Sequence, residues 1–546
     1  MKPEIKCSSV IITIGLLLML VSLTSGCTAE RNTARDGSVE VEQVQQEEQH
    51  VDLKLDLPTD ALYIVVRTED FNLIPGQISS SDLASTVVAR QMFRSLALPT
   101  GKGEAEKDLA SDWWSEADNQ VWNVALNDGA VMHDGTRLTA DYIAELWNPH
   151  LHGELDSPAA VALSNVEDVQ VIDEHHLRFH LQRPDGQFPA SVLTSAALMI
   201  GETDDVDDQE NLIGSGAFRF FRYTSYGAAV LRPSNEEQLQ FSSLVFQPLS
   251  ADIDLSEPED WSEETDEMLR RADVIMYLHP DEVQSVQSNL YLRVISSPGF
   301  NVRGLVVNDR ITPFNSVQLR KALFYALGSG DDIISSLDPG SDLRYISSTS
   351  TWLPSSHPLN DEMPLLGNAE PERAAEFFMD AGLTRNDEGY WEHERGQATV
   401  PLECNILLPK DSFAVSDLLA QKIAQRLENA GVRVVKDWVP WRQFLSRFFS
   451  KQYDIAFTGW GSWSAAPENF LAPWLYSQGV NTINEQDRLN VDQMLEYEST
   501  SEDVLRWLGE QYLFLPLYTT EVTVAVRRDL SSLSELLPVP RFHLIE

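Results

Sequence analysis

The stretch Leu126-Asn-Asp-Gly-Ala-Val-Met-His-Asp-Gly-Thr-Arg-Leu-Thr-Ala-Asp141 combines a turn with the start of a helix, and it is the most recognisable part of the sequence. Asp134 and Gly135 are residues that supply unusual backbone angles in turns. Thr139 can cap the helix that follows, because its side-chain oxygen can accept a hydrogen bond from a free backbone N–H group. His133 and Asp134 resemble a catalytic pair, but this setting favours a structural role for both.

The chain on either side of this stretch alternates strand-like and helix-like segments. Ala61–Val66 has the pattern of a buried strand, and Val169–Leu181 has that of a hairpin. Helices are predicted after Ser316, which can cap one, and from Pro371, which suits a first helical turn. A third helix carries an apolar stripe from Leu419 and is followed by another strand. This alternation indicates an α/β protein.

The first residues predict an export signal. An apolar run from Val10 to Leu23 follows a positively charged start and is too short to span a membrane comfortably. It ends in small residues before Cys27, a pattern that resembles the cleavage site of bacterial lipoproteins. We therefore expect a signal peptide at 1–26 and a lipid on Cys27, with an ordinary secretory signal as the alternative. Either way, the mature chain leaves the cytoplasm.

Residues 28 to about 58 are rich in Glu, Gln, Ser and Asp, and such a segment buries too little apolar surface to order itself. The predicted role of this segment is a disordered tether between membrane and body. Of the three cysteines, Cys7 lies in the signal, Cys27 is the expected lipid site, and Cys404 lies on the apolar face of an alternating strand. Cys404 is therefore predicted to be a core residue, and no intramolecular disulfide is expected.

The composition excludes one class of partner. The formal net charge is -44, from 84 acidic and 40 basic residues. Nucleic-acid binding is not expected, because contacts to phosphates need Lys and Arg. The acidic surface favours a well-solvated protein over a receptor for a cationic ligand.

No catalytic set is predicted. Gly214-Ser-Gly216 invites a nucleophile interpretation, but it lacks the Gly-x-Ser-x-Gly spacing of a strand-to-helix elbow. Neither a His-Glu-x-x-His zinc helix nor a phosphate-binding Gly-rich loop with Lys occurs. We therefore expect no enzyme activity, no cofactor and no metal.

Several short motifs, taken in order, resemble those of the solute-binding proteins that serve ABC importers of peptides, nickel and related solutes. The resemblance covers nearly the whole body, and no single motif is decisive. Ser215 and Ala217 depart from the Thr and Pro of the family's Gly-Thr-Gly-Pro-Tyr turn. The matching stretches are Met92–Leu96, Leu109–Trp113, Leu126–Asp141, Ile213–Phe218, Asn308–Ala326, Ala420–Val434, Tyr453–Ile455 and Pro516–Tyr518.

The resemblance implies a type II periplasmic-binding-protein-like α/β fold, in which a hinge joins two main lobes and a third lobe is inserted. It also implies a small-molecule or peptide ligand, ABC permease subunits as partners, a monomer, and an extracytoplasmic location, in the periplasm or at the cell surface. The expected limits are 1–26 for the signal, 27–58 for the tether, 59–92, 214–302 and 511–546 for lobe I, 93–213 for lobe II, and 303–510 for lobe III.

The resemblance also points to a ligand site. Peptide-binding members of the family carry a loop of the pattern Trp-x-x-Asp-(x)3-Pro, whose aspartate pairs with the α-ammonium group of the peptide. Trp460 and Pro467 match this pattern, but Trp463 occupies the aspartate position. An indole ring attracts an ammonium group by only about 0.5–2 kcal/mol, whereas burying that group unpaired costs several kcal/mol. An atypical or non-peptide ligand is therefore expected, and the candidate ligand-binding residues are Trp463, Trp460, Ser462, Glu468 and Asn469.

Alternatives remain open for these residues and for the function. Trp463 can equally be a hydrophobic plug under its loop, and Trp460 is slightly more consistent with packing than with binding. An extracytoplasmic ligand sensor with no dedicated permease is the second functional hypothesis. A hydrolase is the third, and it lacks a recognisable catalytic set.

Overall fold

The computed structural model describes residues 60–545, apart from 80–81, 101–103, 152–156, 204–210, 236–238, 251–252, 280–281, 338–344, 355–356, 358–359, 361–366, 411–416, 463–469, 471–483, 497–500, 531, 534–536 and 538–539. The predicted signal and tether lie outside these residues. Within them, no helix combines the length and the apolar character that crossing a bilayer requires.

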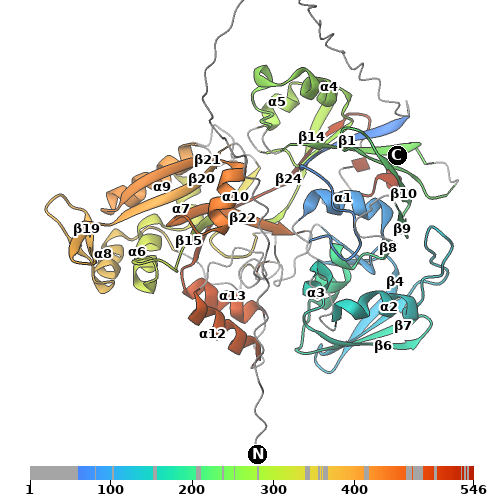
Figure 1. The fold of residues 1–546 in the computed structure, drawn as a ribbon, viewed down its shortest axis with the longest axis horizontal. Coiled ribbons are helices and arrows are strands. Elements are labelled where there is room, and N and C mark those ends of the chain that lie inside the picture. Colours follow the sequence, from blue (N-terminus) through green and yellow to red (C-terminus); the bar gives the residue numbers. More distant parts are fainter. Residues whose placement is uncertain are drawn as a thin grey trace, which may run out of the picture. The chain divides into compact units, whose positions relative to one another are not determined.

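A seven-stranded mixed sheet gathers strands from the two ends and the middle of the sequence (Figure 1). The helix α1 (Leu83–Met92) packs against one face, and the helices α4 (Glu263–Arg271) and α5 (Val283–Gln287) pack against the other. The strands, in spatial order, are β10 (Phe218–Tyr223), β11 (Ala229–Pro233), β12 (Ser243–Leu249), β1 (Ala61–Arg67), β13 (Val274–Met276), β24 (Val522–Arg527) and β14 (Leu292–Ser297).

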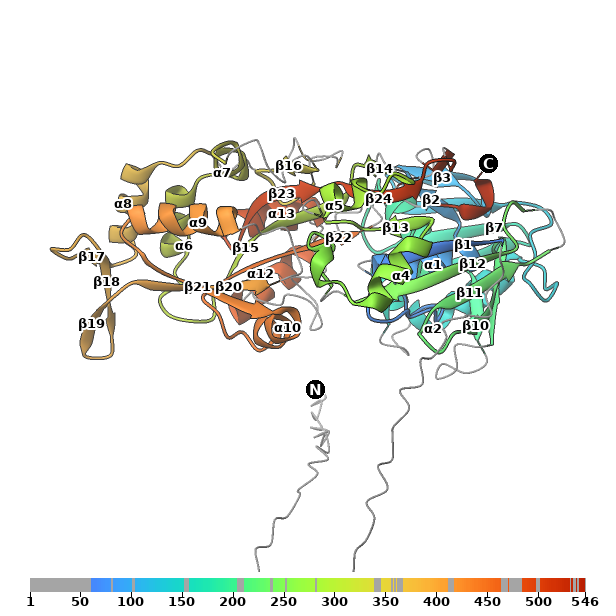
Figure 2. The same ribbon diagram turned by 90° about the horizontal axis from the view of Figure 1, so that it is seen from above.

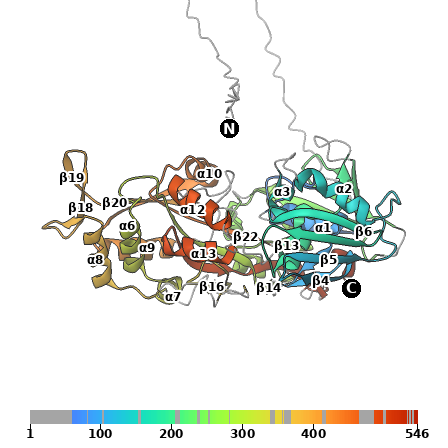
Figure 3. The same cartoon turned by 90° about the horizontal axis from the view of Figure 1, so that it is seen from below.

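A four-stranded antiparallel sheet follows α1 in the chain. One face packs on α2 (Ala140–Leu151) and α3 (Pro158–Ala162) around a separate apolar core (Figure 3). Its strands are β4 (Ala110–Glu116), β5 (Val121–Leu126), β7 (His176–Leu181) and β6 (Val166–Asp173). The same part of the chain forms two antiparallel two-stranded ribbons. They are β2–β3 (Ala97–Pro99 and Ala105–Lys107) and β8–β9 (Gly201–Thr203 and Leu212–Gly214).

A six-stranded mixed sheet forms the core of the remaining chain, with strands β16 (Ile346–Ser348), β23 (Phe514–Thr520), β15 (Phe300–Val307), β22 (Ile455–Ser462), β20 (Glu403–Lys410) and β21 (Arg433–Pro440). One apolar core joins it to α6 (Val317–Leu327), α7 (Gly330–Ser335), α8 (Pro371–Asp380) and α9 (Asp417–Asn429). A second core joins it to α10 (Trp441–Phe449), α12 (Glu485–Glu496) and α13 (Ser501–Glu510). A small sheet of β17 (Thr384–Arg385), β18 (Trp391–Arg395) and β19 (Ala398–Pro401) lies between α8 and β20 in the chain.

The helix boundaries follow the local sequence. Ser316 caps α6, because its side-chain oxygen accepts a hydrogen bond from the Leu319 N–H group at 3.4 Å, and Gly328 ends the helix with a φ of 78°. Left-handed backbone of this kind favours glycine. Pro371 starts α8 as predicted. Cys404 is fully buried and burial raises its thiol pKa well above the ordinary value, so its core role is confirmed.

The chain passes twice between the seven-stranded and six-stranded sheets. It leaves β14 at Ser297 and enters β15 at Phe300, and it returns from β23 at Thr520 to β24 at Val522 (Figure 2). The first change of sheet lies a few residues from the lobe limit predicted at 302, whereas the second lies about ten residues beyond the limit predicted at 510. The lobe limits themselves stay predictions.

Candidate ligand-binding site

Both large sheets present the carboxyl ends of their parallel strands where the chain crosses between them. In the seven-stranded sheet β1, β12 and β13 are parallel, and the pairing of Ser297 with Val522 lies at their carboxyl end. In the six-stranded sheet β20, β21 and β22 are parallel, and Ser462 at the end of β22 is paired with Phe300. Open α/β sheets bind ligands outside the carboxyl ends of their strands. We call the region around the paired residues Ser297 and Val522 and the paired residues Phe300 and Ser462 the crossing edge. It is the candidate ligand-binding site.

A side-chain amide holds the two crossing segments together. The Asn301 Nδ2 group donates to the Thr520 carbonyl oxygen at 2.6 Å. The Asn301 Oδ1 atom accepts from the Thr520 backbone N–H group at 2.8 Å and from its hydroxyl at 3.0 Å. A Cβ atom at Gly299 would lie 2.5 Å from the Thr520 carbonyl oxygen, so only glycine allows this approach. The two segments therefore form one narrow, hydrogen-bonded connection.

A buried ion pair stabilises the edge on the side of the seven-stranded sheet. Arg67, at the end of β1, pairs with Glu282, and their side chains are only 9% and 2% exposed. The Glu282 carboxylate also accepts from the backbone N–H groups of Leu255 at 3.0 Å and His279 at 2.8 Å. The Arg67 Nη1 group donates to the Ile253 carbonyl oxygen at 2.8 Å. These bonds fix the loops that follow β12 and β13.

Arg303 brings a second positive charge to this edge from β15. Its register partners are Gly459 and Tyr518, and burial lowers its guanidinium pKa to about 10. Arg303 is therefore protonated at neutral pH. Burial, followed by the charges of Arg67 and Arg303, lowers the pKa of His279 well below its ordinary value, so this imidazole is neutral. The edge thus combines the Arg67–Glu282 ion pair, the protonated Arg303 guanidinium and a neutral histidine.

The structure describes only part of the predicted site. Trp460 is 7% exposed, and its ring lies 4.5 Å from that of Phe514 in the apolar core that includes Val302. Ser462 ends β22 at the crossing edge, but its side chain lies outside the described atoms. Trp463, Glu468 and Asn469 also lie outside the described residues. The predicted loop therefore starts at the crossing edge, and the binding roles of its residues stay predictions.

Sequence reasoning missed Asn301, Thr520, Arg303 and the Arg67–Glu282 pair. One signal was present: Phe300-Asn-Val-Arg-Gly-Leu-Val-Val307 places an amide and a guanidinium inside an otherwise apolar strand. A buried polar side chain needs a partner, so such residues point to a specific contact. The identity of that contact depends on residues more than 200 positions away in the chain.

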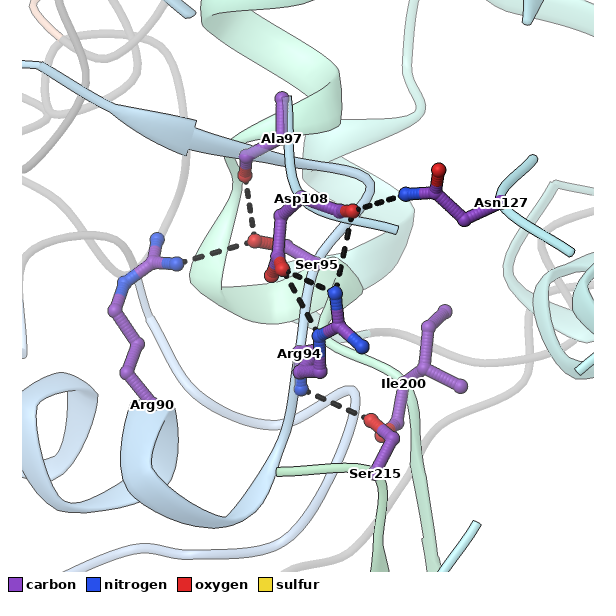
Figure 4. Close-up of polar contacts among 8 residues, drawn as sticks. All are labelled: Arg90, Arg94, Ser95, Ala97, Asp108, Asn127, Ile200 and Ser215. Carbon is purple, nitrogen blue, oxygen red and sulfur yellow. Dashed lines mark hydrogen bonds and ion pairs between the residues drawn. The ribbon is translucent and has the colours of Figure 1, made fainter. Parts of the chain in front are cut away.

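The end of α1 is joined to the four-stranded sheet by a dense polar network, shown in Figure 4. Arg94 binds Asp108 through Nε at 2.9 Å and Nη2 at 2.6 Å. Ser215 accepts from the Arg94 backbone N–H group at 3.0 Å, and its hydroxyl donates to the Ile200 carbonyl oxygen at 2.9 Å. Ser215 therefore has a structural role. Arg90 adds a bond to the Ser95 hydroxyl at 3.2 Å.

His133 completes this network. The Gly214 backbone N–H group donates to its Nδ1 atom at 3.1 Å, so Nε2 carries the proton and donates to the Gly216 carbonyl oxygen at 3.0 Å. Asp134 instead binds the backbone N–H group and the hydroxyl of Thr136. The structural role predicted for His133 and Asp134 is confirmed by these bonds.

Acid is expected to weaken this network. Burial lowers the pKa of His133 in the folded chain, so between the unfolded value of about 6.5 and this lower value the unfolded chain binds more protons. The contribution of His133 is complete above about pH 6.5 and falls as the pH drops further, by up to about 1.4 kcal/mol per pH unit. Urea unfolding between pH 7.5 and pH 5 is the measurement. The variant His133→Gln should show a smaller pH dependence than the native chain, and an unchanged dependence would contradict this assignment.

The crossing edge offers no metal site among the residues described, since no three His, Cys, Asp or Glu side chains are grouped there or elsewhere in that part of the chain.

A chain that crosses twice between two α/β sheets at their carboxyl edges is arranged as a solute-binding protein of the periplasmic type.

Comparison with known proteins identifies the family. Residues 104–482 match the model of the bacterial extracellular solute-binding proteins, family 5. The chain belongs to this family. It is 21% identical to the oligopeptide-binding protein OppA of Bacillus subtilis, over 81% of this chain and 82% of that protein. It is 24% identical to the probable D,D-dipeptide-binding protein DdpA of Escherichia coli, over 50% of this chain and 53% of that protein.

Solved structures confirm the fold class. The nickel–histidine complex of NikZ from Campylobacter jejuni matches with a TM-score of 0.68 and 18% identity, covering 87% of this chain and 95% of that one. The agropinic acid complex of AgaA from A. tumefaciens matches with a TM-score of 0.63 and 16% identity, covering 88% and 96%. The predicted type II periplasmic-binding-protein-like fold is confirmed. The chain is an extracytoplasmic solute-binding protein of the peptide and nickel type for ABC import, not an enzyme.

Proposed function

We propose that this protein is anchored to a membrane through Cys27, closes around a solute at the crossing edge, and delivers it to an ABC permease. The observation that carries the proposal is the double crossing at Asn301 and Thr520, where both sheets end their parallel strands. A narrow connection of this kind allows rotation about a few residues, which is how hinged binding proteins close. The polar network between Arg94, Asp108 and Ser215 supports the same view, since it ties the four-stranded sheet to the seven-stranded one.

The proposed ligand is a non-peptide solute or an atypical peptide. Support comes from Trp463, which stands where peptide-binding members of the family carry an aspartate. Among proteins of the same fold, NikZ was solved with a nickel–histidine complex and AgaA with agropinic acid, so this architecture also holds ligands that are not ordinary peptides. Arg303 supplies a protonated guanidinium at the crossing edge, and guanidinium groups pair well with carboxylates. A solute with a carboxylate and a flat apolar part fits these groups.

The identity of the solute is open to a direct experiment. The mature protein is purified from its own host without denaturation, unfolded, and the released small molecules are identified by mass spectrometry. We expect one main solute that carries a carboxylate and lacks a free peptide amino end. Recovery of mainly di- to pentapeptides with free amino ends would contradict the proposed ligand class.

The anchor and the delivery step need their own measurements. Mass spectrometry of the mature N-terminus should show a lipid on Cys27, and Cys27→Ser should release the protein from the membrane. Deletion of the protein should abolish uptake of the identified solute. Normal uptake after deletion would instead favour a sensor that serves no permease.

A further inference from the structure

Two arginines face each other at the free edge of the seven-stranded sheet. Arg219 of β10 and Arg232 of β11 are direct register partners, and both side chains are exposed. Like charges placed opposite each other on neighbouring strands destabilise a sheet. Among the described residues, neither guanidinium has a carboxylate within ion-pair distance. The chain has 84 acidic and only 40 basic residues. Two neighbouring arginines without an acidic partner therefore indicate a binding partner outside this protein.

Exposed aromatic rings accompany the pair. The Arg232 guanidinium stacks 3.3 Å from the centre of the Phe221 ring, which is 43% exposed. Tyr226, in the turn between the two strands, is 37% exposed. A stacked guanidinium keeps its N–H groups at its rim, where they can bind phosphate oxygens. The sequence between Glu210 and Glu236 contains no acidic residue, and we call its β10–β11 portion, residues 218–233, the arginine–aromatic hairpin.

The register places this hairpin beside the first strand of the body. Leu231 of β11 pairs with Leu244 of β12, which puts Arg232 next to Ser243, and Ser243 pairs with Ala61, the first residue of β1. Neighbouring strands lie about 4.8 Å apart, so Arg232 is about 10 Å from the point where the N-terminal segment joins the sheet. This is the amino end of β1, opposite the crossing edge. The hairpin is therefore separate from the candidate ligand site.

We propose that the arginine–aromatic hairpin docks this protein on an anionic phospholipid surface. Arg219 and Arg232 bind headgroup phosphates, and the rings of Phe221 and Tyr226 lie at the level of the headgroups. Protein surfaces that bind at the membrane interface typically combine arginines with partly exposed aromatic rings. This combination favours a lipid surface over an acidic protein as the partner of the hairpin. The docking rests on the N-terminal anchoring proposed above, because the anchor brings this end of the body to the membrane.

The experiment uses the full anchored chain, reconstituted in nanodiscs of phosphatidylcholine alone or of phosphatidylcholine with phosphatidylglycerol. Hydrogen exchange of residues 218–233, followed by mass spectrometry, reports contact with the surface. We expect slower exchange only when phosphatidylglycerol is present, and its loss in the double variant Arg219→Gln/Arg232→Gln. The control Arg137→Gln/Arg270→Gln removes the same charge from exposed arginines that already pair with acidic residues, and it should behave like the native chain.

Co-sedimentation with phosphatidylglycerol vesicles measures the hairpin without depending on nanodisc incorporation. Each arginine near an anionic surface contributes about fivefold to binding, so the double variant should bind roughly 30-fold more weakly at low salt. A chain that fails to enter nanodiscs but still shows this arginine-dependent co-sedimentation would contradict the anchor and support the hairpin. Equal exchange in both nanodiscs, or protection that needs permease instead of phosphatidylglycerol, would overturn the docking proposal.

Discussion

Replacing Glu282 by alanine is expected to lower the free energy of unfolding by about 3–5 kcal/mol, because it leaves the buried Arg67 charge without its partner. The Glu282 carboxylate also satisfies two backbone N–H groups, those of Leu255 and His279, and both would lose their acceptor. Urea unfolding monitored by tryptophan fluorescence is the measurement.

Two control variants separate this effect from a general loss of charge. Asp266→Ala breaks an exposed pair with Arg270 on α4, and it should change the free energy of unfolding by less than about 1 kcal/mol. The double variant Arg67→Met/Glu282→Leu removes both buried charges together and should recover much of the stability lost by Glu282→Ala. If Glu282→Ala were no more destabilising than Asp266→Ala, the pair would not be a structural support of this edge.

The local structure of this chain could be predicted because its causes are local. Ser316 caps the start of α6 and Pro371 occupies the first turn of α8, as the chemistry of each residue predicts. Cys404 was assigned to the core from the alternation of its strand, and it is buried. The fold class followed from the order of short motifs spread along the chain, several of which are turns or helix boundaries with a local physical cause.

The contacts that build the crossing edge could not be predicted in the same way. Asn301 and Thr520 are 219 residues apart, and Arg67 and Glu282 are 215 apart. Neither pair leaves a periodic pattern, since each depends on strands that meet only in the folded sheet. The polar residues within the apolar strand 300–307 could have shown that a special contact exists, but not which residue would make it.

Two tryptophans three positions apart should respond differently to the same substitution. Trp460→Ala is expected to lower the free energy of unfolding by about 3–5 kcal/mol, because the indole is 7% exposed and packs on Phe514 in an apolar core. Trp463→Ala is expected to change stability by less than about 1 kcal/mol, on the proposal that its ring covers the solute. Urea unfolding of both variants, prepared without ligand, is the measurement.

Ligand retention provides the opposite contrast. An aromatic ring that closes over a ligand contributes about 0.5–2 kcal/mol, so Trp463→Ala should bind the co-purified solute roughly 2- to 30-fold more weakly. Isothermal titration with the solute identified by mass spectrometry gives both affinities, and Trp460→Phe serves as the control that keeps an aromatic ring in the core. Unchanged affinity together with a large loss of stability in Trp463→Ala would assign that indole to packing. The ligand would then be recognised by other groups at the crossing edge, and Arg303 would be the first of these to test.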